Sequence, residues 1–161
     1  MPLLRKSLPA YFRETSLGLW LLIGVGVVRF LLKPVLGIPY EQASMYASVT
    51  ILSLILLVVY PVLAARRRET YRDMLGIAAA ISITTAAISI IAIGVDEMSG
   101  LGTYFTDPGH GGEMNPFLHM LGHALGGLFG TLIGWGLGAL VLLIAGTVRK
   151  AKSGSTDSVA G

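Results

Sequence analysis

Four long, almost purely apolar stretches alternate with short polar segments along the chain. They cover about residues 16–36, 43–65, 74–95 and 117–148. A helix needs about 20 apolar residues to cross the roughly 30 Å hydrocarbon core of a bilayer, so each stretch is long enough to span one. The pattern predicts an all-α integral membrane protein, in which residues 1–150 form a single domain built as a bundle of four transmembrane helices.

The two ends of the chain carry different signals. Basic residues precede the first stretch and its uninterrupted apolar core, residues 17–28, has 12 residues, which resembles a secretory signal peptide. No small-x-small cleavage motif follows that core, so we expect a retained helix. Residues 151–161 are small and polar, and we expect them to form a disordered tail on the cytoplasmic side.

Composition agrees with a membrane protein and narrows its chemistry. Hydrophobic residues make up 53% of the chain and charged residues 13%, about half the roughly 25% of a typical soluble domain. A chain this apolar is neither a disordered protein nor an ordinary soluble domain. The absence of cysteine from the sequence excludes disulfides, thiolate metal ligands, iron–sulfur clusters and cysteine nucleophiles.

The charged residues are divided between the two sides of the predicted helices. Ten of the twelve basic residues flank the stretches on one side: Arg5, Lys6, Arg13, Arg66, Arg67, Arg68, Arg72, Arg149, Lys150 and Lys152. The loops on the other side contain acidic residues and no basic one: Glu41, Asp96, Glu97, Asp107 and Glu113. Because basic residues stay on the cytoplasmic side, we expect a multi-pass protein of the plasma (inner) membrane with both termini in the cytoplasm and an extracytoplasmic loop at residues 96–116. The basic cluster at residues 66–68 then faces anionic lipid headgroups, which argues against a nucleic-acid partner.

A ladder of glycines runs through the fourth stretch at every fourth position: Gly122, Gly126, Gly130, Gly134 and Gly138. Small residues at this spacing let a neighbouring helix approach closely, which favours helix association in lipid. One candidate partner is the third stretch, where Ala78, Ser82 and Ala86 repeat at the same spacing. The other is a second copy of the chain, in a homo-oligomer, or a different membrane protein.

All three histidines lie close together in the sequence, at His110, His119 and His123, and Asp107 and Glu113 lie near them. Asn followed by Pro at residues 115–116 is a good helix start, which places His119 and His123 on one face at the outer mouth of the fourth helix. That spacing can chelate a metal, so these five side chains are a candidate metal or ligand site, with zinc or copper as the ion. Haem held by two histidines on opposing helices is not expected, because the fourth span is the only one that contains histidines. The alternatives are ordinary interfacial polar residues and a site for proton sensing.

Arg29 and Lys33 interrupt the first stretch and share one helix face. A charged residue inside a membrane helix is costly and marks a functional site by default. Asp96 and Glu97, at the end of the third stretch, lie at a similar predicted depth and are candidate ion-pair partners. Two interpretations remain: structural pairing or snorkelling to the interface, and a path for an ion or anionic substrate.

No catalytic constellation in the sequence is complete. The zincin motif H-E-x-x-H lacks its glutamate because Met120 follows His119, and no G-x-S-x-G motif occurs. We therefore expect a protein without catalysis of its own, acting as a self-associating or partner-binding membrane subunit through the glycine ladder. The alternative is transport or sensing of an ion or transition metal at the histidine and carboxylate cluster. A second alternative is a membrane enzyme that uses the same histidines.

Overall fold

The chain folds into helices joined by short connections. The structure, a computed structural model, describes residues 3–157, with side-chain placement for all of them except Tyr40, Glu41, Ser44 and residues 147–157. In chain order the elements are α1 (Leu8–Glu14), α2 (Ser16–Leu36), α3 (Tyr40–Tyr46), α4 (Val49–Arg66), α5 (Tyr71–Ser99), the 3-10 turns η1 (Tyr104–Thr106) and η2 (Pro108–His110), and α6 (Pro116–Asp157). Residues 3–157 contain no strand, which confirms the predicted helical class.

Four of these helices are long and apolar enough to cross a bilayer. They cover Ser16–Leu36, Val49–Arg66, Tyr71–Ser99 and Pro116–Gly146. Their outward surfaces are also apolar, since Trp20 is 70% exposed and Phe129 is 61% exposed. A continuous surface of this kind would drive aggregation in water, whereas lipid solvates it. The chain therefore has the architecture of a multi-pass helical membrane protein.

The second predicted helix is divided in two. The sequence predicts one helix over residues 43–65, but a break at Ala47 and Ser48 separates α3 from α4. The side chain of Ser48 accepts a hydrogen bond from the amide of Ile51 at 3.2 Å and so caps the start of α4. A serine N-cap satisfies an amide that the helix itself leaves unpaired, which explains why the second span begins at Val49.

Two helices extend past their predicted ranges. α5 covers more than residues 74–95 because Thr70 and Asp73 form a capping box before its first turn, and it ends at Gly100 in the left-handed conformation. α6 is helical to Asp157, through most of the segment expected to be a disordered tail. The lysines and alanine at residues 150–152 are good helix formers, which lets the helix continue beyond the span. Residues 158–161 lie outside the described residues.

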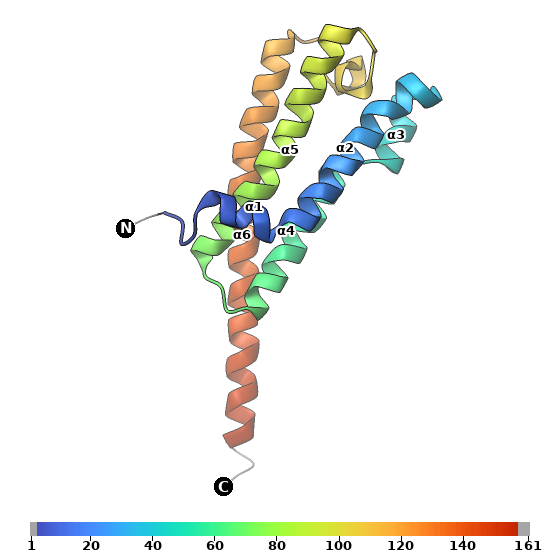
Figure 1. The fold of residues 1–161 in the computed structure, drawn as a ribbon. Helices are drawn as coiled ribbons and strands as arrows, with labels where there is room; N and C mark the ends of the chain where they lie inside the picture. The colour runs from blue at the N-terminus through green and yellow to red at the C-terminus, as the bar shows by residue number, and fades with distance from the viewer. Residues whose placement is uncertain (1–2, 158–161) are drawn as a thin grey trace.

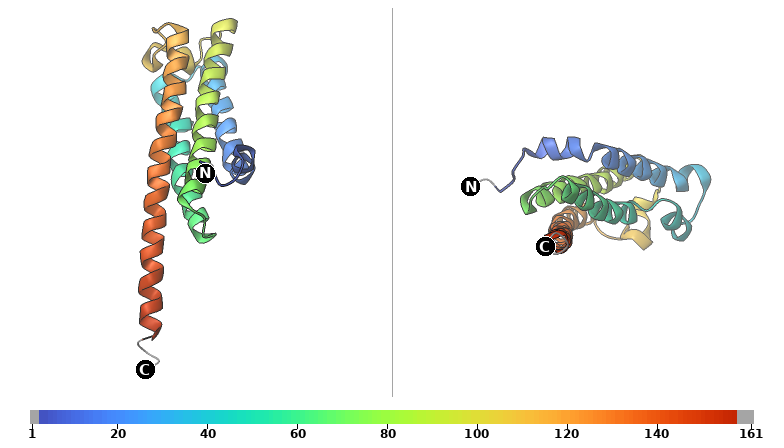
Figure 2. Two further views of the ribbon diagram at one scale, coloured as in Figure 1. Left: turned by 90° about the vertical axis from the view of Figure 1, so that its left-hand side faces the viewer. Right: turned by 90° about the horizontal axis from the view of Figure 1, so that it is seen from below.

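α5 lies at the centre of the arrangement and contacts α1, α2, α4 and α6. α4 also packs against both α2 and α6, and α1 lies across the helices near the start of α5 (Figures 1 and 2). The C-terminal part of α6 extends past the ends of the other helices. The core between them is built from fully buried or nearly buried apolar side chains of α1, α2, α4 and α5, such as Leu22 of α2, Leu57 of α4, and Met74 and Ile81 of α5.

α1 is attached to α5 by one buried tyrosine. Tyr11 is fully buried, and its hydroxyl donates a hydrogen bond to Oδ1 of Asp73 at 2.9 Å. Gly76 makes this approach feasible, because a Cβ at that position would lie 2.3 Å from the Tyr11 ring. The short first helix is therefore held against the start of α5 by packing and by a hydrogen bond to a charged acceptor.

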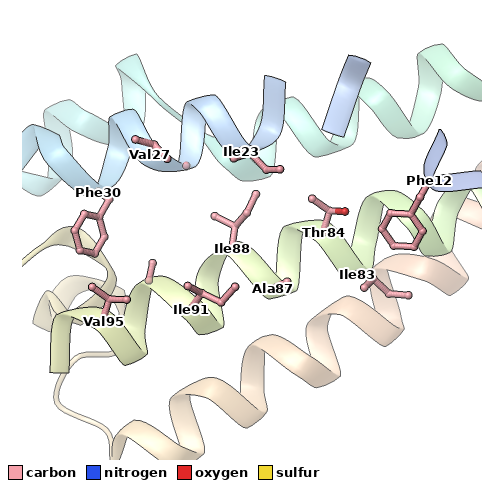
Figure 3. A pocket seen from close by; sticks show the side chains of 12 residues that line it. Phe12, Ile23, Val27, Phe30, Ile83, Thr84, Ala87, Ile88, Ile91 and Val95 are labelled. Carbon is pink, nitrogen blue, oxygen red and sulfur yellow. The ribbon is translucent and has the colours of Figure 1, made fainter. Parts of the chain in front are cut away.

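An apolar cavity of about 470 Å³ lies between α2 and α5 (Figure 3). Val27 and Phe30 line it from α2, and Ile88 and Ile91 line it from α5. Thr84 is the one polar side chain of the lining, and its hydroxyl already donates to a carbonyl of its own helix at 2.9 Å. Ligand sites combine apolar walls with a few polar groups that orient the ligand, so this cavity matches hydrocarbon better than a polar ligand.

The glycine ladder winds around α6 and does not lie on one face. Each residue turns an α-helix by about 100°, so a step of four residues moves about 40° around the axis. The C-terminal half of the ladder faces the same chain: a Cβ at Gly134 would lie 2.6 Å from Leu57 and 3.0 Å from Ala78. Similar close contacts of 3.1 Å and 2.9 Å would arise between Gly130 and Ser82 and between Gly138 and Met74. Gly122 and Gly126, in contrast, have no such neighbouring atom within 4 Å.

Candidate metal centre

One carboxylate holds the connection between α5 and α6 against the end of α5. Asp96 is 2% exposed, and its Oδ2 accepts hydrogen bonds from the amide of Thr103 at 2.7 Å and from the Thr103 hydroxyl at 2.8 Å. The hydroxyl of Thr106 donates to the same oxygen. Hydrogen bonds to an ionised acceptor are about twice as strong as neutral ones, so Asp96 fixes the path of the connection.

Two further contacts attach this connection to the opposite side of the protein. The hydroxyl of the buried Tyr104 donates to the backbone carbonyl of Ile38, which follows α2. Lys33 of α2 pairs with Asp107 at 2.8 Å between Nζ and Oδ2. The hydrogen bond from Lys33 is the main reason that the pKa of the Asp107 carboxyl is below its usual range. The connection is thus held between α2 and α5, and we call residues 100–115 the bridging loop.

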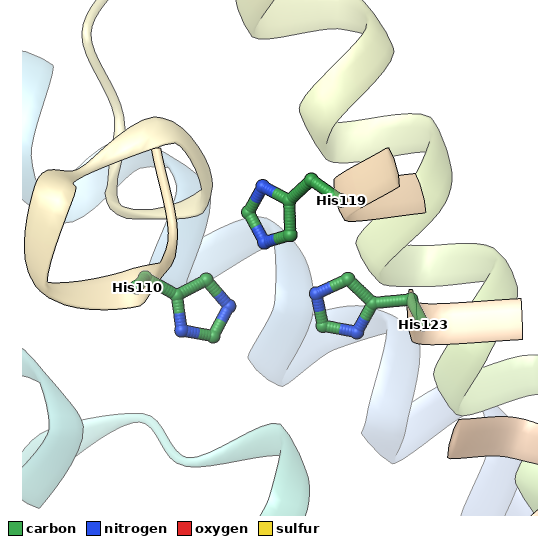
Figure 4. A group of neighbouring side chains, drawn as sticks. All are labelled: His110, His119 and His123. Carbon is green, nitrogen blue, oxygen red and sulfur yellow. The ribbon is translucent and has the colours of Figure 1, made fainter. Parts of the chain in front are cut away.

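His110 lies at the end of η2, where the bridging loop turns back on itself. The His110 amide donates to the carbonyl of Asp107 at 2.8 Å, and Gly111 then adopts a φ of 92°, which favours glycine. Gly112 also has to be glycine, since a Cβ there would lie 1.8 Å from the carbonyl oxygen of Thr106. This tight turn directs the His110 imidazole toward α6 (Figure 4).

The other two histidines lie on α6, which begins where the sequence predicts. Pro116 is its first residue, and the Oδ1 of Asn115 accepts a hydrogen bond from the Phe117 amide at 2.9 Å. This cap and the fixed φ of proline define the first turn. His119 and His123 are one turn apart, so their side chains project from the same face toward His110 (Figure 4).

The three imidazoles converge on one point. One ring nitrogen of each histidine lies within 4.8 Å of the corresponding nitrogens of the other two. The ring centroids are 5.6 Å apart for His110 and His119, 5.6 Å for His110 and His123, and 5.1 Å for His119 and His123. His119 is 8% exposed and the other two are half-buried. Side chains from a loop and a helix therefore meet in a largely enclosed cluster, which we call the histidine triad.

The surroundings favour the neutral form of His110. Burial, and after it the positive charge of Arg29, lowers the pKa of His110 from an ordinary value near 6.5 to about 4. At neutral pH this imidazole is therefore uncharged. A neutral imidazole has a free lone pair on one nitrogen, which is the form that binds a metal ion.

This donor set fits a divalent transition metal. Zinc binds imidazole nitrogen at about 2.0–2.1 Å, which places the nitrogens of a tetrahedral site about 3.4 Å apart. Starting from separations of at most 4.8 Å, each ring would move by less than about 1 Å to reach that geometry. Three protein ligands leave a fourth position of the ion open, as in zinc sites that bind a water or another small ligand. Imidazole also suits copper, which remains the second ion for this site.

The other predicted ligands are not brought to the triad. The Asp107 carboxylate is paired with Lys33, and Glu113 is exposed. Thioether sulfur would favour copper(I), but Met98 and Met114 are 84% and 52% exposed, and Met120 packs against the core cluster that contains Phe105. The part of the predicted cluster that the fold assembles is therefore the three histidines alone.

The predicted ion pairs between the first and third spans have different partners in the structure. Lys33 pairs with Asp107 of the bridging loop, and Asp96 accepts hydrogen bonds from the same loop. Glu97 is exposed, and Arg29 is buried with a hydrogen bond from Nη1 to the carbonyl of Ala47 at 3.2 Å. The bridging loop contacts both spans, so Lys33 and Asp96 each interact with the loop and not with one another.

Comparison of the chain with protein-family models, with curated proteins and with solved structures gave no match.

Proposed function

We propose that this protein is a multi-pass membrane protein that binds a divalent transition metal through His110, His119 and His123, and that zinc is the favoured ion. The observation that carries the proposal is the convergence of three imidazole nitrogens from two separate elements to within 4.8 Å of one another. Two histidines one turn apart are common on a helix, but the third is brought to them by a loop with its own set of anchoring contacts. Three imidazole nitrogens in enclosed surroundings are a ligand set that zinc takes in open sites.

The charge distribution supports a location of this site at the extracytoplasmic face. The basic residues at positions 66–68 lie at the end of α4 opposite to the bridging loop, so the positive-inside rule favours an extracytoplasmic triad and cytoplasmic termini. Arg149, Lys150 and Lys152 contribute to this orientation from the sequence alone, since their side chains lie outside those described.

Cysteine labelling tests the orientation, because the natural chain has no cysteine. Arg67→Cys and Met98→Cys place single thiols at exposed positions on the two sides. A membrane-impermeant maleimide should react with the Met98→Cys protein in intact cells and with the Arg67→Cys protein only after lysis. The opposite pattern would invert the topology and place the triad in the cytoplasm.

Metal binding is tested by titration of the detergent-purified protein against a chromophoric zinc chelator. We expect one zinc ion per chain, and we expect the His119→Ala/His123→Ala double variant to lose it. Glu113→Gln is the matched control, because this carboxylate lies in the bridging loop but is exposed and is not part of the triad. Equal zinc binding by the wild type and the double variant would refute the proposal.

A second function, as a self-associating or partner-binding membrane subunit, is favoured by the exposed half of the glycine ladder. Gly122 and Gly126 have no close neighbour in the chain, so they leave a smooth surface on which another helix could pack. This surface is shorter than the full ladder, because Gly130, Gly134 and Gly138 contact α4 or α5. Crosslinking in membranes tests it: Gly126→Val should reduce dimer formation, and a wild type that crosslinks only as a monomer would remove this function.

A further inference from the structure

Arg29 is a buried cation with no counter-charge among the described side chains. It is 7% exposed, and its Nη1 donates to the carbonyl of Ala47 at 3.2 Å. Its Nε has no hydrogen-bond partner, and none of the ion pairs among the described side chains involves it. Removing a cation from water is costly unless a partner compensates it, so the position of Arg29 calls for an anion that none of the described side chains supplies.

Arg29 and the histidine triad are linked through one aromatic ring. The guanidinium carbon of Arg29 lies 5.9 Å from the centroid of the Phe105 ring, and that ring packs edge-on against His110 at 6.1 Å. Arg29 therefore belongs to the electrostatic surroundings of the metal site.

The charges of a loaded site do not balance. A divalent ion on three neutral imidazoles keeps its two positive charges, and Arg29 adds a third nearby. The described carboxylates of this region are engaged elsewhere or exposed. Asp96 accepts hydrogen bonds from the bridging loop, Asp107 pairs with Lys33, and Glu113 lies at the surface. In half-buried surroundings two cations repel strongly unless a negative group lies between them.

We propose that the open position of the metal site binds an oxyanion, a carboxylate or a phosphate group, with one oxygen on the metal and another accepting a hydrogen bond from Arg29. This inference rests on the proposed metal site and names the class of its ligand. A guanidinium suits this role because it stays charged and has several N–H donors, so that Nε can bind the anion while Nη1 remains on the Ala47 carbonyl. The anion satisfies the unpartnered Nε and fills the fourth position of the ion.

Cobalt(II) is the probe ion for the test, because its visible absorption reports a change of ligands where zinc is silent. The cobalt affinity and spectrum of the purified protein are measured with and without acetate, as a carboxylate, and methylphosphonate, as a phosphate-like anion. If anion binding and cobalt binding are coupled by a free energy of typical size, the preferred anion should tighten cobalt binding by about tenfold and change the visible spectrum. The arm that shows the larger effect identifies the class of oxyanion.

Arg29→Gln separates the role of the guanidinium from that of the metal ligands. We expect the anion to change the cobalt affinity of this variant by less than about twofold, because the second contact is lost. Without any anion the variant should bind cobalt more tightly than the wild type, because a repelling positive charge has been removed. Loss of folding would lower the cobalt affinity, so an increase in affinity distinguishes the removal of a charge from a misfolded variant.

Two more variants complete the test. Arg29→Lys keeps the positive charge but loses the planar guanidinium, so the anion should change its cobalt affinity by an intermediate factor. This variant replaces Arg29→Gln in the test if Arg29→Gln does not fold. Arg13→Gln is the control, because Arg13 is an exposed arginine in the last turn of α1, at the other end of the protein. Its coupling should equal that of the wild type.

The outcomes are distinct. A wild-type protein that binds cobalt without any response to either anion overturns this inference and leaves the proposed metal site standing. A wild-type protein that binds no cobalt or zinc overturns both. Equal coupling in the wild type and in Arg29→Gln overturns the assignment of Arg29.

Discussion

Removing the Asp96 carboxylate should weaken metal binding although Asp96 does not belong to the triad. This side chain holds the bridging loop against α5 by accepting hydrogen bonds from the Thr103 amide, the Thr103 hydroxyl and the Thr106 hydroxyl. The same loop carries His110. In an Asp96→Ala variant the loop loses these bonds, so His110 has to be brought back to His119 and His123 by the metal itself.

The size of the effect follows from those three hydrogen bonds. A bond to a charged acceptor contributes about 1.5–3 kcal/mol net. The Oδ1 of Asp96 is buried without a partner, so the cost of burying that oxygen offsets part of the total. We therefore expect a net loss of about 3 kcal/mol in loop docking, which corresponds to a decrease in metal affinity of at most about 100-fold.

The assay is zinc competition with a chromophoric chelator, with helicity followed by circular dichroism to show that the spans remain folded. We expect Asp96→Ala to bind zinc between about 10-fold and 100-fold more weakly than the wild type. Glu97→Ala is the matched control, since the neighbouring carboxylate is exposed, and its affinity should be unchanged. An Asp96→Ala protein with wild-type affinity would refute the view that the bridging loop positions His110.

Three further predictions test other parts of the structure. Gly134→Val should lower the free energy of unfolding by about 1–3 kcal/mol, because its Cβ would meet Leu57 at 2.6 Å. Gly136→Val should leave the free energy of unfolding unchanged, because Gly136 has no neighbour within 4 Å. Denaturant unfolding in mixed micelles measures both variants. Tyr11→Phe should destabilise the protein by about 1.5–3 kcal/mol in the same assay, because Asp73 loses a buried donor. Docking of the bridging loop should weaken as the pH falls from near 6.5 toward about 4. In that range His110 takes up a proton when the loop is released but not when the loop is docked. Above pH 7 loop docking should not depend on pH. Amide hydrogen exchange of residues 103–112 measures this, and a His110→Gln protein with the same pH dependence would show that another group is responsible.

The spans and the start of α6 could be predicted because both depend on local signals. Length and hydropathy are enough to locate a helix in a bilayer, and Asn115 followed by Pro116 defines a helix start without reference to the rest of the fold. The break at Ser48 could also have been found, since serine is a strong N-cap residue, but an apolar run on both sides concealed it. The winding of the glycine ladder could also have been predicted, because a spacing of four residues advances about 40° around a helix at each step.

The contacts of the bridging loop could not be predicted in the same way. Asp96 lies at the end of a span near the level of Arg29, so an ion pair was the natural expectation. Its true partners lie seven and ten residues further along, in a loop whose path no periodic pattern defines. The same holds for Tyr104, which reaches a carbonyl 66 positions earlier in the chain. Convergence of His110 on the other two histidines depends on these long-range contacts, which is why the sequence indicated five candidate ligands and the fold assembles three.

X-ray absorption spectroscopy of the zinc-loaded protein tests the central claim most directly, because it reports the ligands of the ion itself. The account predicts three imidazole nitrogens at about 2.0–2.1 Å together with one non-histidine ligand, and a decrease to two imidazoles in the His110→Ala variant. A zinc environment that lacks the imidazole signature, or one that is identical in wild type and His110→Ala, would contradict it.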